Sequence, residues 1–288
     1  MPDQAPPHLL LFGLGYSGAA IARAAARLGW RVTATSRNPA ALTPPPDVAL
    51  IPTGAAAAAL ATATHLLATA PPGDQGDPIL ARYAPALTHL RWIGYLSTTG
   101  VYGNRDGAWV DETTPPAPTR PRSRRRLAVE LAWRAAAHAA LDIFRLAGIY
   151  GPGRSPFADL RAGRARRILK PTHLFGRIHR DDIAGAVLAA ARQAPPPGVR
   201  IFNLTDNEPA ASADVIAEAA RLLGIPPPPP IPFDAATLSP MAQSFWSENR
   251  RVRSALTQQI LHRPWTYPTY REGLRATLAE ELAQHPPQ

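Results

Sequence analysis

Residues 8–29 of the chain read HLLLFGLGYSGAAIARAAARLG, and this segment carries most of the information about fold class. It opens with a short apolar run, His8–Phe12, which is typical of a strand buried in a parallel sheet. Residues 16–28 are rich in alanine and stop next to Gly29, as an α-helix does. Between them, GLGYSG fits the pattern G-x-G-x-x-G. A strand, a glycine-rich turn and a helix in this order begin a βαβ unit that binds dinucleotides.

In a dinucleotide-binding turn, each of these glycines has a physical role. Gly13 permits the tight turn, Gly15 lets the backbone come close to a pyrophosphate, and Gly18 lets the helix pack against the strand. The helix N-terminus adds amide donors and the positive end of the helix dipole. The alternative is a glycine-rich turn that binds no ligand. The predicted cofactor-binding loop comprises Gly13, Leu14, Gly15, Tyr16, Ser17 and Gly18.

Apolar runs alternate with helical segments along the first half of the chain. This alternation implies βαβ units and a parallel sheet that is covered on both faces. The predicted fold class is therefore α/β, with a Rossmann-type doubly wound parallel sheet and a smaller C-terminal substrate lobe. Further strands are expected at 31–36, 47–52, 65–70, 91–97 and 142–146, and further helices at 55–61, 78–90 and 122–138.

The alternation of apolar runs and helical segments ends after Gly151, where an irregular basic segment follows. We predict an NAD(P)-binding Rossmann domain at 1–150 and a smaller C-terminal lobe at 151–288, partly interleaved with the core. In the second range we expect helices at 181–193 and 212–223, a strand at 200–204, a stiff proline connector at 226–230 and a mostly helical segment at 247–283.

The end of the second predicted strand favours NADP over NAD. NAD-binding proteins usually have an acidic residue there, which accepts hydrogen bonds from the ribose hydroxyls. This chain has Ser36 and Arg37 instead. A hydroxyl followed by a guanidinium suits a 2′-phosphate, because arginine binds phosphate through two parallel hydrogen bonds. The alternative is that Arg37 is a solvated loop cation. Ala70, which ends the fourth predicted strand, completes this part of the predicted cofactor site.

The charge of the chain raises a rival function, nucleic-acid binding. The formal net charge is +10, and Lys170 is the only lysine among 31 cationic residues. Arginine clusters at 120–126 and 161–167 could bind a phosphate backbone. However, they lack stacking aromatic residues, and GC-rich codons also explain an arginine excess. We therefore expect only weak, non-specific binding to nucleic acid.

Composition and hydropathy exclude other classes. The chain has no cysteine, so disulfides and thiolate metal sites are excluded, and a reducing cytoplasm is the expected location. No apolar stretch of about 20 residues predicts a membrane span. His173, His179, Asp181 and Asp182 could suit a metal by residue type. Carboxylates at a helix N-terminus explain the two aspartates better, so no metal site is predicted.

Motifs beyond the glycine turn resemble the extended and atypical short-chain dehydrogenase/reductase families, including the NAD(P)-dependent epimerase/dehydratase group. They follow one another in the family's order to about residue 190, and fainter similarity continues through 251–274. The resemblance implies an NAD(P)-dependent enzyme and is strongest to atypical members of the sugar-nucleotide epimerase kind. The segments are YLSTTGVYG (95–103), VDETTPPAPT (110–119), RLAGIYGPGR (145–154) and RIHRDDIAGAVLAA (177–190).

In that family a Ser or Thr and a Tyr-x-x-x-Lys motif carry out the chemistry. The resemblance places Thr98 at the Ser/Thr position, with Ser97 and Thr99 as alternatives. It places Arg122 at the tyrosine position and Arg126 at the lysine position, so the motif reads Arg-x-x-x-Arg. Residues 103–149 contain neither tyrosine nor lysine. The usual proton-transfer residue is therefore absent from its expected place.

Replacement of this motif changes the expected chemistry. Arg126 could replace the lysine as a fixed cation that binds the nicotinamide ribose, and it joins the predicted cofactor site for that reason. Arg122 cannot replace the tyrosine, because a guanidinium has no proton to exchange near neutral pH. Tyr102 and Tyr150 are candidate substitutes, although each could equally be a packing residue. Arg122 and Arg126 share a helix face, and two neighbouring cations favour an anionic ligand.

We therefore predict an NADP-dependent oxidoreductase or epimerase-like protein that acts on a small carbonyl, hydroxyl or sugar-nucleotide substrate. An NADP-binding regulatory or scaffold protein with reduced catalysis is the alternative, and a basic nucleic-acid-binding protein is the second alternative. The expected partner is a small anionic molecule, with no specific nucleic acid and no membrane. The oligomeric state is left open, with a homodimer as one candidate.

Overall fold

A computed structural model of the chain describes residues 5–239, 243 and 245–284. The chain forms two compact units. Unit 1 comprises the chain up to Val101, together with Arg120–Arg145 and Ile183–Phe202; unit 2 comprises Tyr102–Thr119, Leu146–Asp182 and the chain from Asn203 onward. The sequence prediction divided the chain at residue 150 and expected the C-terminal lobe to be partly interleaved with the core. In the structure the chain passes into unit 2 at Tyr102–Thr119 and again at Leu146–Asp182, and it returns to unit 1 each time.

Unit 1 is built on the main sheet, in which the strand order is β3-β2-β1-β4-β5-β7-β11. The pairings of β1 with β2 and β4, of β2 with β3, and of β4 with β5 are parallel. The order runs outward from β1 on one side and from β4 on the other, which confirms the doubly wound prediction. The strands are β1 (His8–Phe12), β2 (Arg31–Ser36), β3 (Val48–Pro52), β4 (His65–Ala68), β5 (Trp92–Thr98), β7 (Ala140–Leu146) and β11 (Gly198–Leu204).

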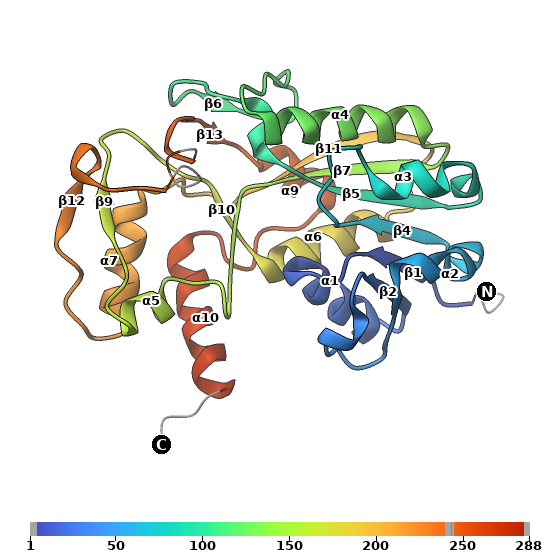
Figure 1. Cartoon of the computed structure of the whole chain (residues 1–288), viewed down its shortest axis with the longest axis horizontal. Helices are drawn as coiled ribbons and strands as arrows, with labels where there is room; N and C mark the ends of the chain where they lie inside the picture. Colours follow the sequence, from blue (N-terminus) through green and yellow to red (C-terminus); the bar gives the residue numbers. More distant parts are fainter. Residues whose placement is uncertain (1–4, 240–242, 244, 285–288) are drawn as a thin grey trace. The chain divides into compact units, whose positions relative to one another are not determined.

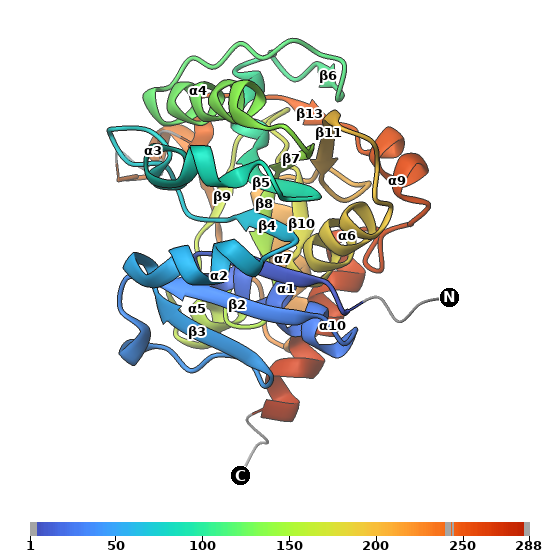
Figure 2. The ribbon, with the colours of Figure 1, turned by 90° about the vertical axis from the view of Figure 1, so that its right-hand side faces the viewer.

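Helices cover both faces of this sheet, as Figures 1 and 2 show. Successive side chains of a strand point to opposite faces. Leu10 and Phe12 therefore pack in the core with α2, α3 and α4, while Leu11 lies against the turn that opens α1. On one face lie α1 (Tyr16–Arg27) and α6 (Arg180–Arg192), and on the other lie α2 (Ala56–Thr62), α3 (Pro78–Tyr83) and α4 (Pro121–Ala136).

Short 3-10 helices connect several of these elements. The helix predicted at 78–90 ends as an α-helix at Tyr83 and continues as a 3-10 turn, since Pro85 has no amide to donate. The 3-10 helices are Pro39–Ala41, Thr53–Ala55, Ala84–Leu87, Thr99–Tyr102 and Phe233–Ala235.

Unit 2 has its own core, in which Phe157, Ala219 and Leu274 are buried. Its strands form small parallel pairs, β8 with β10, β9 with β12, and β6 with β13. Part of the predicted proline connector is strand β12. The strands are β6 (Trp109–Val110), β8 (Gly148–Tyr150), β9 (Arg167–Leu169), β10 (Arg177–His179), β12 (Pro230–Pro232) and β13 (Arg251–Val252), and the helices are α5 (Phe157–Arg161), α7 (Ser212–Leu222), α9 (Ala255–Leu261) and α10 (Tyr270–Gln284).

None of the described helices is long and apolar enough to cross a lipid bilayer.

Candidate dinucleotide-binding and catalytic site

The glycine turn lies where β1 ends, next to β4, at the point where the strand order reverses. In open α/β sheets this is the place where ligands bind, outside the carboxyl ends of the strands. Gly13 has φ +102°, a conformation that favours glycine. Its amide donates to Thr35 Oγ1 at 3.2 Å, and the Leu14 amide donates to the Thr35 carbonyl at 2.9 Å. Thr69 Oγ1 donates to the Gly13 carbonyl at 2.5 Å. The turn is thus held from both neighbouring strands.

Gly18 and Gly15 are required for different reasons. A Cβ on Gly18 would lie 2.6 Å from the Gly13 carbonyl oxygen and 3.2 Å from Leu11 Cδ2, so the helix could not pack this closely. A Cβ on Gly15 would meet no atom within 4 Å. Gly15 is exposed and is the N-cap residue of α1, with no side chain to cap the helix. The open space and the uncapped helix N-terminus fit the pyrophosphate of a dinucleotide.

The end of β2 keeps the predicted phosphate-binding residues accessible. Ser36 is half-buried, and its hydroxyl accepts the Asn38 amide at 3.1 Å. Arg37 is exposed and has no hydrogen bond or ion pair to another described residue. Its guanidinium is therefore open to an external anion such as a 2′-phosphate.

The loop after β4 contributes Ala70 and two aspartates that the sequence reasoning did not single out. The Ala70 amide donates to the Phe12 carbonyl at 3.1 Å, which fixes this loop beside the glycine turn. Asp74 forms an ion pair with Arg125 of α4. Asp77 caps α3, accepting the Ile79 amide at 2.8 Å, and burial raises the pKa of its carboxyl group.

Thr98 lies at the end of β5, as the resemblance implied. Its hydroxyl is half-buried and accepts the Gly100 amide at 3.1 Å. A Cβ on Gly100 would lie 3.3 Å from Thr98 Oγ1 and 2.8 Å from Ser123 Oγ. The buried Ser123 of α4 therefore lies close to Thr98, which the sequence reasoning missed because only the packing of α4 brings them together.

The two arginines of the Arg-x-x-x-Arg motif have different environments. Arg122 is exposed and forms no hydrogen bond or ion pair with the rest of the described chain. Arg126 is half-buried, and its Nη1 donates to the Leu96 carbonyl at 2.9 Å and to Tyr95 Oη at 3.1 Å. Arg126 is therefore a fixed cation beside β5, whereas Arg122 is available to a ligand.

Tyr95 contacts Arg126 through a hydrogen bond and a cation–π interaction, and the sequence reasoning overlooked this tyrosine. The ring is completely buried, and the Arg126 guanidinium lies 5.8 Å from its centroid. Burial raises the pKa of Tyr95 to about 12, although Arg126 opposes the shift. A buried phenol with such a pKa is poorly matched to proton transfer near neutral pH.

The two tyrosines considered as substitutes both belong to unit 2. Tyr102 is completely buried, and its hydroxyl donates to Asn203 Oδ1 at 2.8 Å, which is a packing role. Tyr150 is buried against His179, with the ring centroids 5.2 Å apart. Burial raises the pKa of Tyr150 well above its usual range. Neither environment favours proton transfer, and the catalytic role of either residue stays a prediction.

A buried ion pair supports β5 and α4 from within the sheet. Glu130 of α4 accepts from Arg145 of β7, with Oε2 2.8 Å from Nη2 and Oε1 3.2 Å from Nε. Ser97 donates to the same carboxylate at 2.6 Å. Glu130 thus links the helix that carries the Arg-x-x-x-Arg motif to the strand that carries Thr98.

Two of the four side chains considered for a metal, His179 and Asp182, form hydrogen bonds to backbone amides. His179 is buried, and its Nδ1 accepts the Asp181 amide at 3.2 Å. Asp182 accepts the amides of Thr266 at 2.7 Å and Tyr267 at 3.0 Å. Within the described ranges, no group of three or more suitable side chains could hold a metal ion.

Curated proteins match part of the chain, while no protein-family model matches it. The protein YeeZ of Escherichia coli K12 is 33% identical over 147 residues, which is 50% of each chain. A 3-diazoavenalumate denitrifying reductase from a Streptomyces species is 31% identical over 150 residues, 46% of this chain and 45% of the reductase. The chain thus spans about half the length of the curated relatives it matches.

Solved structures match nearly the whole chain. A conserved protein of unknown function from Silicibacter pomeroyi is 45% identical, with a TM-score of 0.86 over 95% of this chain and 99% of that one. A candidate NAD-dependent epimerase/dehydratase from Methylobacillus flagellatus is 25% identical, with a TM-score of 0.69 over 96% and 99%. MoeE5, solved with UDP-glucuronic acid and NAD, shares the fold at 19% identity, with a TM-score of 0.78 over 96% and 99%.

These matches confirm the family that the motifs predicted. The chain belongs to the same family as the Silicibacter pomeroyi protein, within the short-chain dehydrogenase/reductase type that includes the NAD-dependent epimerases and dehydratases.

Proposed function

We propose that the chain binds NADP(H) in unit 1 and catalyses oxidoreductase or epimerase-like chemistry on a small carbonyl, hydroxyl or sugar-nucleotide substrate. The observation that carries this proposal is the open glycine turn at the β1–β4 switch point, where Gly15 leaves space for a pyrophosphate. The NAD complex of MoeE5 supports a nicotinamide dinucleotide as the cofactor, and the reductase relative supports redox chemistry.

NADP is preferred over NAD because Ser36 and Arg37 stand where an acidic residue would bind the ribose hydroxyls. A carboxylate there would repel a 2′-phosphate, whereas the exposed Arg37 guanidinium can donate two hydrogen bonds to it.

Arg37→Ala is expected to weaken NADPH binding by about tenfold or more, since a charged hydrogen bond contributes about 1.5–3 kcal/mol. NADH affinity should stay nearly unchanged, because NADH has no 2′-phosphate. Calorimetric titration of both nucleotides into both proteins measures this, with Arg27→Ala as a charge-matched control, because Arg27 is exposed in the last turn of α1. Equal NADPH affinity in wild type and Arg37→Ala would refute the assignment of Arg37.

In the proposed site a bound nicotinamide would supply or accept a hydride. Thr98 would orient the substrate hydroxyl or carbonyl, with Ser123 close to it. Arg126 would be a positive charge fixed beside β5, and Arg122 would bind an anionic group of the substrate. None of these side chains is an ordinary acid/base group at neutral pH apart from the weakly acidic hydroxyls.

The same geometry favours a second candidate, an NADP-binding regulatory protein with reduced catalysis. The observation behind it is that the tyrosine position holds Arg122, while Tyr95 is buried beside Arg126.

We expect epimerisation of UDP-sugars to be slow or undetectable, because general acid–base catalysis contributes about 10²–10⁴-fold and the usual tyrosine is missing. The measurement is product formation from UDP-glucose and UDP-glucuronic acid with NADP present. NADPH oxidation with a panel of small carbonyl compounds separates the two candidates, since only an oxidoreductase would oxidise it. Efficient UDP-sugar epimerisation would contradict the replaced-motif proposal.

A further inference from the structure

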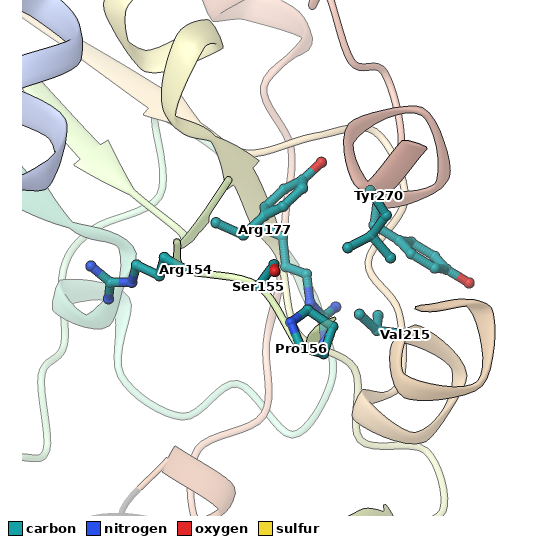
Figure 3. A pocket seen from close by; sticks show the side chains of 8 residues that line it. Arg154, Ser155, Pro156, Arg177, Val215 and Tyr270 are labelled. Carbon is teal, nitrogen blue, oxygen red and sulfur yellow. The ribbon is translucent and has the colours of Figure 1, made fainter. Parts of the chain in front are cut away.

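We propose that unit 2 contains a second ligand site, a cavity that binds a small carboxylate with an apolar or aromatic body through Arg177. The cavity has a volume of about 300 Å³ and is formed by the segment after β8, by β10, and by helices α7 and α10 (Figure 3). It lies entirely within unit 2, whereas the glycine turn belongs to unit 1, so the proposal does not depend on the proposed function.

Arg177 provides the positive charge of this cavity. Its Nη1 donates to the carbonyls of Phe175 and Ala210, both at 3.0 Å, which holds the side chain in place. Figure 3 shows its guanidinium beside Pro156 and Val215, while the Arg154 side chain extends away. A guanidinium has five N–H donors, so donors remain for an oxyanion.

The protein itself does not neutralise this charge by an ion pair. Among the described carboxylates, none lies within ion-pair distance of Arg177. Asp206 acts on it most strongly, but neither carboxyl oxygen of Asp206 has a hydrogen-bond partner in the described part of the chain. Burial raises the pKa of Asp206 to about 8, although the nearby Arg177 opposes the shift. Arg177 is half-buried and has no hydrogen-bonded ion pair, so an anionic ligand in the cavity would gain a direct charged contact with it.

The other residues that line the cavity determine which chemical group the ligand can carry besides its carboxylate. Val215 and Leu274 supply aliphatic surface, and Tyr150 and Tyr270 supply aromatic surface. Tyr150 packs directly on α10, since a Cβ on Gly273 would lie 1.8 Å from its hydroxyl oxygen. A phosphate dianion would exceed the charge of one guanidinium and would be poorly solvated by these walls. A monocarboxylate with a ring or a short alkyl chain matches both features.

The size of the cavity limits the ligand. At about 30 Å³ for each water, the cavity corresponds to roughly ten water molecules, so it is large enough to hold benzoate. For a ligand this small, an affinity of about 1 mM is expected.

The test titrates benzoate into the whole protein and follows binding by ligand-observed NMR, with benzamide as the neutral isostere. Benzoate is expected to bind at least about tenfold more tightly than benzamide, because only the anion gains the charged hydrogen bonds of Arg177. Arg177→Gln should lower the affinity for benzoate by about the same factor. Arg164→Gln is the matched control, since Arg164 is an exposed arginine of unit 2 that pairs with Asp159.

A second variant covers the case in which Arg177→Gln does not fold, because Arg177 also holds backbone carbonyls. Val215→Phe fills the cavity from α7 and leaves the guanidinium in place, so it should abolish benzoate binding. Loss of binding in Val215→Phe with retention in Arg164→Gln supports the site. Equal binding of benzoate and benzamide, unchanged binding in Val215→Phe, or no benzoate binding by the wild-type protein would overturn it.

Discussion

Glu130→Ala is expected to lower the free energy of unfolding by about 3–5 kcal/mol, because it removes the carboxylate that pairs with the buried Arg145 cation. The Arg145 side chain is 2% exposed and the Glu130 side chain is 0% exposed. Ser97 would also lose the acceptor of its 2.6 Å hydrogen bond. The cost is therefore larger than the loss of one contact, since the remaining polar groups cannot reach water.

Urea unfolding of the wild type and the variant measures this effect. Asp74→Ala removes the exposed Arg125–Asp74 pair, whose side chains are 49% and 87% exposed, and should cost at most about 1 kcal/mol. The double variant Glu130→Leu with Arg145→Met should be more stable than Glu130→Ala, because it removes both charges. If Glu130→Ala costs no more than Asp74→Ala, the buried pair does not have the role assigned to it.

Gly15→Val is expected to reduce NADPH affinity by at least about a hundredfold while leaving the fold intact, because the side chain fills the space where a pyrophosphate would approach the backbone. The backbone at Gly15 has φ −89° and ψ −168°, an extended conformation that valine adopts easily. No protein atom lies within 4 Å of the added Cβ.

Gly18→Val is the matched comparison from the same turn. Its Cβ would lie 2.6 Å from the Gly13 carbonyl oxygen, so the first turn of α1 must move away from β1 and stability should fall. Thermal unfolding and NADPH fluorescence separate the two effects. Normal unfolding with lost binding is expected only for Gly15→Val. NADPH binding unaffected by Gly15→Val would place the cofactor elsewhere.

Much of the main sheet could be predicted, because its strands are short apolar runs separated by helices that cover them. The runs at 31–36 and 65–70 correspond closely to β2 and β4. The segment at 200–204 was expected in the C-terminal lobe, but β11 pairs at the edge of the main sheet. The local hydrophobic pattern predicts that a segment forms a strand. It does not predict which strand that segment pairs with, because pairing depends on residues that are distant in the chain.

The same limit applies to the site. The glycine turn was predictable because its residues are consecutive and each glycine meets a backbone requirement. The hydrogen bonds of Thr35 and Thr69 to the turn come from other strands and have no local signature. Arg122 and Arg126 were correctly placed on one helix, but only the docking of α4 on β5 brings Arg126 to Tyr95 and leaves Arg122 exposed.

Amide hydrogen exchange with and without saturating NADPH tests most directly whether residues 13–18 hold the cofactor. The amides at the start of α1 should exchange more slowly with NADPH, because the pyrophosphate accepts hydrogen bonds from them. Residues 212–222 of α7 in unit 2 should be unchanged and serve as the internal reference. Slower exchange confined to the turn and the adjacent ends of β2 and β4 is the predicted result. Unchanged exchange across residues 13–18 with NADPH bound would contradict it.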